Sequence, residues 1–193
     1  MTQTPKLLPV RLYGDVMLRV TLQPVHKVDD KLRLFIRDLI HTMYERDGVG
    51  LAANQVGHNH RIFVIDPDWG KEESERNPIV MINPVIVSAE GEFELEEGCI
   101  SLPGSFAKVK RPEHIKITYM DLDGQEHTEE AEGYRAVVIQ HENDHLNGIL
   151  FVDKLSKLSL LKVKRKLKQI MSTAANGTNI REEVILPEHK QIG

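Results

Sequence analysis

The sequence predicts an α+β fold: antiparallel β-sheets packed around a central helix that carries an H-E-x-x-H motif, with one helix near the N-terminus and another near the C-terminus. Two observations favour this class. Strand-like segments follow one another through the middle of the chain and helical periodicities lie outside them, which is typical of α+β proteins. The spacing of the H-E-x-x-H motif also suits a helix. A length of 193 residues suits one domain, expected at residues 1–173 and followed by a tail at 174–193.

Each element follows from a local pattern. Amphipathic periodicity predicts helices near residues 29–46, 134–147 and 156–172. Runs of β-branched and aromatic residues predict strands at residues 61–66, 79–87, 114–122 and 125–130. Asp123-Gly124 joins the last two strands and is a strong hairpin signal. Gly148 is well placed to end the second helix, and the longest linker-like stretch is residues 66–78.

Composition excludes several classes of function. A net charge of −4 and a pI near 6.1 argue against a general nucleic-acid binder, so no DNA partner is expected. The sequence has no run of 18 apolar residues and no Arg/Ser-rich presequence. We therefore expect a cytoplasmic protein without a membrane partner. The single cysteine allows no internal disulfide, which suits a reducing compartment.

The segment from His141 to His145 has the spacing of a metal-binding helix. Four residues span about 6 Å along a helix and about 13 Å along a strand, so only a helix lets both imidazoles share one metal ion. Glu142 lies beside that face and is free to take a proton from a metal-bound water. The alternative is a pair of solvent-facing histidines on an ordinary helix, but the neighbouring apolar residues Val137 and Val138 argue against it.

A catalytic site needs a third protein ligand and leaves one position for water. The metzincin pattern would place a histidine at position 151, where this chain has Phe151. A thermolysin-like protease would need a glutamate on a second helix. The downstream candidates lie in a polar segment without a helical pattern, at Glu182, Glu183 and Glu188. Both protease readings therefore fail at the third ligand.

Cys99 can complete the site. It lies in a loop between Gly98 and Pro103-Gly104. A lone cysteine is usually a buried structural thiol. Beside two histidines that lack a third ligand, however, a thiolate is a strong ligand for zinc or ferrous iron.

The small residues between Gly48 and Gly57 form a third informative stretch. They contain G-x-G-x-x-A, as dinucleotide-binding loops do, with Asp66 at the end of the next strand. A helix precedes the motif where a strand is required, so we reject that reading. Small residues here permit close approach of the backbone to another group, and Gln55 offers an amide donor.

Together, three segments resemble the peptide deformylases. Gly48 to Gln55, Glu97 to Ser101 and Gln140 to Gly148 match the patterns G-x-G-L-A-A-x-Q, E-G-C-L-S and Q-H-E-x-D-H-L-x-G in that order. The likeness spans about residues 8–172. The sequence departs from the family at Ile100, where the pattern has leucine, and at Phe106, where many bacterial members place an arginine near the substrate entrance.

The resemblance implies a bacterial hydrolase that removes the N-formyl group from the N-terminal methionine of newly synthesised proteins and releases formate. The implied metal ligands are Cys99, His141 and His145. The implied catalytic groups are Glu142, the Gln55 amide and the Ile100 backbone N–H. The implied substrate-binding residues are Val49, Gly50, Leu95, Glu97, Val137 and Val138. The implied metal is Fe²⁺, one per chain, with Zn²⁺, Ni²⁺ or Co²⁺ as possible substitutes; the sequence alone would accept zinc equally.

The expected partners are N-formylmethionyl nascent peptides and the ribosome. The segment from Leu155 to Met171 is rich in lysine and has no acidic residue, although the chain is acidic overall. We expect Leu158, Leu161 and Ile170 to dock its other face on the body of the protein. A merely solvated basic face is the alternative.

Two other classes of function remain open from the sequence. A metalloendopeptidase would need a long substrate cleft. A non-catalytic protein would need a closed metal site with a fourth protein ligand, for which His114 and His127 on the predicted hairpin are candidates.

Overall fold

The structure is a computed structural model that describes residues 4–71 and 75–181. Its helices are α1 (Asp30–Glu45), α2 (Gly133–His145) and α3 (Lys157–Met171). Short 3₁₀ turns are η1 (Val16–Arg19), η2 (Ala53–Val56) and η3 (Phe151–Lys154). The strands are β1 (Val10–Arg11), β2 (Gly50–Ala52), β3 (Ile62–Ile65), β4 (Ile79–Glu90), β5 (Phe93–Glu97), β6 (Ala107–Arg111), β7 (His114–Met120), β8 (Glu126–Glu132) and β9 (Ile180–Arg181).

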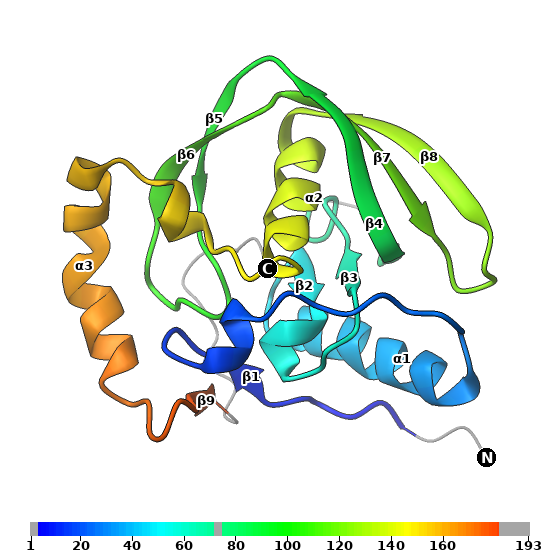
Figure 1. Cartoon of the computed structure of the whole chain (residues 1–193), viewed down its shortest axis with the longest axis horizontal. Coiled ribbons are helices and arrows are strands. Elements are labelled where there is room, and N and C mark those ends of the chain that lie inside the picture. Colours follow the sequence, from blue (N-terminus) through cyan, green and yellow to red (C-terminus); the bar gives the residue numbers. More distant parts are fainter. Residues whose placement is uncertain (1–3, 72–74, 182–193) are drawn as a thin grey trace.

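The strands form three antiparallel sheets. The largest has the order β2-β3-β4-β7-β8, and the others pair β5 with β6 and β1 with β9. β4, β7 and β8 pass over α2, which stands in the middle of the molecule (Figure 1). α2 contacts strands of both the large sheet and the β5–β6 sheet. The predicted α+β fold with a central motif-bearing helix is confirmed.

The predicted elements fall close to the observed ones. All three helices and four strands are present, and β7 and β8 form the predicted hairpin. Its loop lies between Asp121 and Gln125, whose backbones bond at 3.0 Å. Gly124 has φ +76° in this loop, as the last residue of a three-residue hairpin loop requires. The strand prediction missed β5 and β6, whose connecting loop contains Cys99.

Two hydrophobic clusters make up the core. The larger one lies between α1, α2 and the five-stranded sheet. The smaller one lies between β6, η3 and α3 and includes Cys99, Phe151 and Val163. Because Cys99 belongs to the smaller cluster and α2 to the larger one, the predicted ligands meet where the two clusters adjoin.

α3 docks on a different face from the one predicted. Val163 and Ile170 are buried, whereas Leu158 is 71% and Leu161 is 61% exposed. At about 100° per residue, the two exposed leucines lie roughly 140° and 160° around the helix from Val163. The prediction was therefore right for Ile170 and wrong for Leu158 and Leu161, because leucines lie on both sides of this helix.

The segment that follows α3 contacts the body of the protein as far as it is described. β9 pairs with β1, and the buried Asn179 side chain donates to the carbonyl oxygens of Tyr13 and Ile170 at 2.8 and 2.9 Å. The boundary at residue 173 stays a prediction. Among the described helices, none is long and apolar enough to cross a membrane.

Candidate metal centre

The end of α2 is fixed by a glycine. The N–H groups of Gly148 and Ile149 donate to the carbonyl oxygens of His145 and Asp144 at 3.1 and 3.0 Å. These bonds form a Schellman motif, which needs a left-handed residue, and Gly148 has φ +70°. A Cβ at Gly148 would also lie 2.6 Å from the carbonyl oxygen of Arg19. The predicted role of Gly148 is confirmed, and it ends the helix directly after the second histidine.

Three predicted ligands converge at the middle of the molecule. Cys99, His141 and His145 are buried, and one donor atom from each lies within 4.8 Å of the others. Cys99 Sγ and His145 Nε2 are 3.3 Å apart. The Nδ1–H of His141 donates to Glu97 at 2.8 Å, so its Nε2 is left buried without a hydrogen-bond partner. A carboxylate on the far ring nitrogen is the usual arrangement of a metal-bound histidine.

The chemistry of these donors fits a metal ion. Burial raises the pKa of the Cys99 thiol and lowers the pKa of His145 well below its ordinary value. His145 is therefore a neutral ligand, and a thiolate at Cys99 needs a cation beside it. One sulfur and two nitrogens suit zinc or ferrous iron. No fourth His, Cys, Asp or Glu of residues 4–71 and 75–181 joins the group.

The candidates for a fourth ligand lie elsewhere. His127 is bonded to Asp121 at 2.7 Å, and His114 lies 3.6 Å from Glu132. Both histidines are exposed on the β7–β8 hairpin. The donor set in the described chain is therefore open, as in catalytic rather than structural sites.

Glu142 lies beside the metal ligands with its charge uncompensated. It is completely buried, and neither carboxylate oxygen has a hydrogen-bond partner. Burial raises its pKa well above the ordinary value. A Cβ at Gly50 would lie 2.5 Å from Oε1 of Glu142. The small residue at the start of β2 is thus required by the carboxylate, and a carboxyl group with a raised pKa suits proton transfer near neutral pH.

Gln55 is held in one orientation. Its Oε1 accepts from the backbone N–H of Ala52 at 2.8 Å. Its Nε2 faces the cysteine loop, donating to Ser101 Oγ at 3.2 Å and to Cys99 Sγ at 3.5 Å. Gly48, in the same sequence motif as Gln55, also packs against this loop: a Cβ at Gly48 would lie 2.5 Å from Ile100 Cδ1. All three sequence motifs therefore meet around one site.

Glu97 has a role that the sequence analysis did not predict. It is completely buried, and Oε1 accepts from Arg111 Nε at 2.5 Å. Oε2 accepts from Arg111 at 2.9 Å and from His141 at 2.8 Å. Burial opposes ionisation, yet the hydrogen bonds from Arg111 and His141 lower the pKa of Glu97 to about 2. With both oxygens bonded to protein donors, the Glu97 side chain is placed to orient His141. Its predicted contact with substrate stays a prediction.

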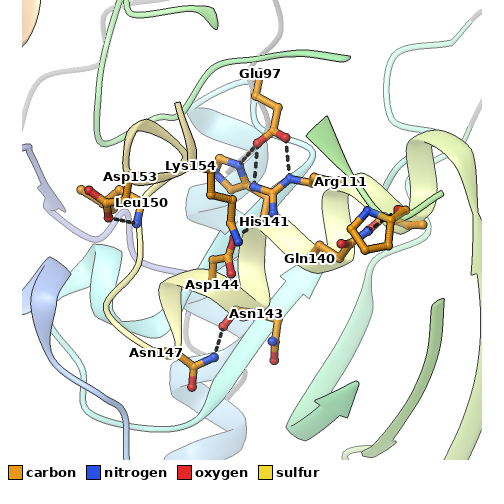
Figure 2. Close-up of polar contacts among 12 residues, drawn as sticks. Glu97, Arg111, Gln140, His141, Asn143, Asp144, Asn147, Leu150, Asp153 and Lys154 are labelled. Carbon is orange, nitrogen blue, oxygen red and sulfur yellow. Dashed lines mark hydrogen bonds and ion pairs between the residues drawn. The ribbon is translucent and has the colours of Figure 1, made fainter. Parts of the chain in front are cut away.

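Arg111 is a residue of the site that the sequence analysis missed. It also donates to Asp144 of α2 at 2.7 Å, so it links β5, β6 and α2 (Figure 2). Its side chain is 2% exposed. A signal existed in the sequence: Arg111 takes the inward position of a strand in which Lys108 and Lys110 point outward.

The remaining predicted substrate residues lie on α2 or on the strands and loop beside it. Val49, Val137 and Val138 are buried in the larger core cluster, and Leu95 is half-buried against it. Gly50 adjoins Glu142. These positions are compatible with an apolar pocket beside the metal ligands, which stays a prediction.

The residues on which the rejected interpretations depended can also be examined. Phe151 occupies the metzincin ligand position, and its ring lies 6.2 Å from that of His141. Glu182, Glu183 and Glu188 lie outside the described residues. The residues after Gly48 form strand β2, antiparallel to β3, and not the start of a crossover helix. A dinucleotide-binding loop is therefore absent from this segment.

A buried Cys-His-His set with an unpartnered carboxylate is the arrangement expected of a metal-dependent hydrolase. Comparison with known proteins identifies the family. The model of the polypeptide deformylases matches residues 7–160, and the chain belongs to that family. It is accordingly a metal-dependent enzyme that removes N-formyl groups from nascent peptides. This membership excludes the endopeptidase and the non-catalytic alternatives.

Individual relatives resemble the chain over most of its length. A peptide deformylase of Saccharophagus degradans is 45% identical over 170 residues, which cover 88% of this chain and 96% of the relative. A crystal structure from Legionella pneumophila has a TM-score of 0.77 at 41% identity and covers 86% of this chain and 95% of that one. A structure from Synechococcus elongatus in complex with actinonin has a TM-score of 0.78 at 41% identity, covering 86% and 90%.

Proposed function

We propose that Cys99, His141 and His145 hold one Fe²⁺ ion, which Zn²⁺, Ni²⁺ or Co²⁺ can replace. The convergence of three buried donor atoms within 4.8 Å carries this proposal. When bound, the ion supplies Lewis acidity and acidifies the water that attacks the formyl carbon. A sulfur ligand beside two imidazoles accepts ferrous iron as well as zinc.

Glu142 moves the proton in this reaction. Its carboxylate takes the proton from the attacking water and passes it to the nitrogen of the departing amine. Two features support this role: neither oxygen is bonded to another described protein group, and burial raises the pKa of Glu142 well above its ordinary value. A base whose pKa lies near the working pH transfers protons in both directions.

Gln55 and Ile100 stabilise the oxyanion. The developing charge on the formyl oxygen would accept hydrogen bonds from Gln55 Nε2 and from the backbone N–H of Ile100. Gln55 is suited to this because its carbonyl oxygen is bonded to Ala52, which keeps the amide nitrogen directed to the cysteine loop. Donors that are already oriented need no reorganisation as the charge develops.

Val49, Leu95, Val137 and Val138 line the pocket for the methionine side chain, and Gly50 binds the peptide backbone. The pocket is apolar because these side chains share the larger core cluster. Phe106 is half-buried where many bacterial relatives place an arginine, so the peptide beyond the first residue is held by other contacts.

The enzyme acts in the bacterial cytoplasm during translation, and α3 brings it to the ribosome. Lys162, Lys164 and Arg165 are exposed, and no ion pair links them to any of the described residues. Phosphate contacts through such a helix would weaken with salt. Lys154 lies outside this surface, because it belongs to η3 and pairs with Asp144.

The test is formate release from a short N-formylmethionyl peptide by protein purified anaerobically, with metal content measured on the same sample. We expect one formate per peptide, activity proportional to iron at one ion per chain, and inhibition by actinonin. The unformylated peptide of the same sequence controls for internal cleavage. Internal cleavage, or turnover unrelated to metal content, would contradict the proposal.

A further inference from the structure

A row of alternating charges leads from the metal centre toward the surface. It begins at Glu97, which holds His141, and continues through Arg111 and Asp144 to Lys154 (Figure 2). Asp144 Oδ2 accepts from Arg111 at 2.7 Å and lies 3.2 Å from Lys154 Nζ. The row therefore joins β5, β6 and α2 to η3, the turn that precedes α3.

Burial decreases steadily along this row. The side chains of Glu97 and Arg111 are 0% and 2% exposed, that of Asp144 is 13% exposed and that of Lys154 is 35% exposed. A buried ion depends on its partners, since removing one leaves an uncompensated charge. Arg111 faces two carboxylates, so its position depends on Asp144 as well as on Glu97.

Lys154 is itself held in place by the turn that carries it. Asp153 accepts from the backbone N–H of Leu150 at 2.8 Å and from Arg19 at 3.1 Å. This turn therefore cannot shift easily relative to the end of α2. Lys154 and Arg111 share Asp144 Oδ2, and together they restrict where that oxygen can lie.

We propose that Asp144 and Lys154 are positioning residues for the metal centre: Lys154 holds Asp144, Asp144 holds Arg111, and Arg111 fixes the carboxylate that orients His141. The inference rests on the proposed ligand role of His141. Neither residue contacts substrate or metal, and both act on the rate at which the site releases its ion. The turn before α3 thereby contributes to metal retention.

The simplest alternative is an ordinary surface ion pair between Lys154 and Asp144. Such a pair would contribute to folding stability, with no particular effect on the metal. Partly exposed pairs are weak, so the expected change for Lys154 is only about two- to fivefold. The experiment must therefore compare metal release with stability in the same variants.

The test uses the zinc-loaded holoenzyme and measures the rate of zinc transfer to a chelator, together with kcat and KM on a short formyl-peptide. The variants are Lys154→Met, Lys154→Arg, Asp144→Asn and the double variant Lys154→Met/Asp144→Asn. Lys157→Met is the matched control, because Lys157 is an exposed lysine at the start of α3 that makes no ion pair with the described residues. Thermal unfolding of each metal-free variant reports stability separately.

We expect Lys154→Met to release zinc about two- to fivefold faster than the wild type, and Asp144→Asn to release it faster still. Lys154→Arg should restore the wild-type rate, and KM should change less than zinc release. In the double variant, Lys154→Met should add nothing to Asp144→Asn, because Lys154 acts through Asp144.

Two outcomes would overturn the inference. The first is that Lys154→Met releases zinc no faster than Lys157→Met. The second is that the effects of Lys154→Met and Asp144→Asn on the release rate multiply in the double variant. If Asp144→Asn fails to fold, the comparison of Lys154→Met with Lys154→Arg and Lys157→Met still decides. A wild-type protein that binds no zinc would instead refute the proposed metal ligands.

Discussion

α2 carries residues of the candidate metal centre and α3 carries a row of cations, and the two helices place these side chains in opposite environments. On α2, His141 and Glu142 are buried, and the ionic groups around them are paired. On α3, Lys162 and Lys164 are exposed, and they form no ion pair with the described residues. One helix therefore holds buried groups at the candidate metal centre, and the other presents cations to solvent.

The difference shows how burial determines what a charge can do. Beside α2, water is excluded, so an unpaired carboxylate has a raised pKa and a paired one has a lowered pKa. On α3, solvent and salt screen each charge beyond about 8–10 Å. We therefore expect large effects of single substitutions at α2, and effects at α3 only when several charges change together.

The largest effect should come from removing a ligand. His145→Ala should lose stoichiometric metal and reduce deformylation to the level of the metal-free protein. His114→Ala is the matched control, an exposed histidine on β7 that should keep full metal and activity. Metal analysis and formate release measure both variants. Metal loss in His114→Ala, or retained metal and turnover in His145→Ala, would show that the ligands are assigned wrongly.

The next largest effect should come from Glu142→Gln. This change keeps the three ligands but removes the group that transfers the proton, so metal content should stay normal while kcat falls about 10²–10⁴-fold. Glu96→Gln, on the exposed side of β5, should change neither quantity. Near-normal turnover of metal-loaded Glu142→Gln would exclude the proposed base.

Much of the metal centre could be predicted from the sequence, because short-range spacing identifies its residues. A spacing of four positions from His141 to His145 places both rings on one helix face, and the sequence has only one cysteine to complete the set. Small residues at Gly48 and Gly50 indicated a close approach, which the structure shows to be toward Ile100 and Glu142.

The rest depends on contacts that no local pattern specifies. Glu97 and Arg111 are 14 positions apart and lie on one face of the β5–β6 pair. Arg111 is paired with Phe93, not with Glu97, so its long side chain must reach along the strand to the carboxylate. Each takes an inward position on its strand, which indicates a buried charge but does not name the partner. On α3, leucines on both sides of the helix made the docking face ambiguous, and Leu158 and Leu161 proved to be exposed.

A smaller effect on the metal centre is expected for Glu97→Gln. The amide can still accept from His141, but the charge opposite Arg111 is lost. We expect metal affinity to fall about 10–100-fold, the range typical of residues that orient a ligand. Chelator competition measures the affinity, again with Glu96→Gln as the control. An unchanged affinity would mean that Glu97 does not orient His141.

The smallest effect on catalysis is expected on α3. Reversing Lys162, Lys164, Arg165 and Lys166 to glutamate should leave hydrolysis of a short formyl-peptide unchanged. Salt-sensitive co-sedimentation with ribosomes should be abolished, because the phosphate contacts are lost.

A control for α3 reverses the same number of cations elsewhere, at Lys27, Lys31, Lys108 and Lys116. This variant has the same net charge and should still sediment with ribosomes. If both variants sediment like the wild type, α3 is not the docking surface. If both are lost from the pellet, net charge and not α3 governs the association.

The central claim is that the chain offers three protein ligands and leaves one position open. X-ray absorption of the zinc-substituted protein tests it most directly. We predict one sulfur at about 2.3 Å, two imidazole nitrogens at about 2.0–2.1 Å and one further light atom from water, with the sulfur lost in Cys99→Ala. A shell of four protein ligands, or a shell without sulfur in the wild type, would contradict the account.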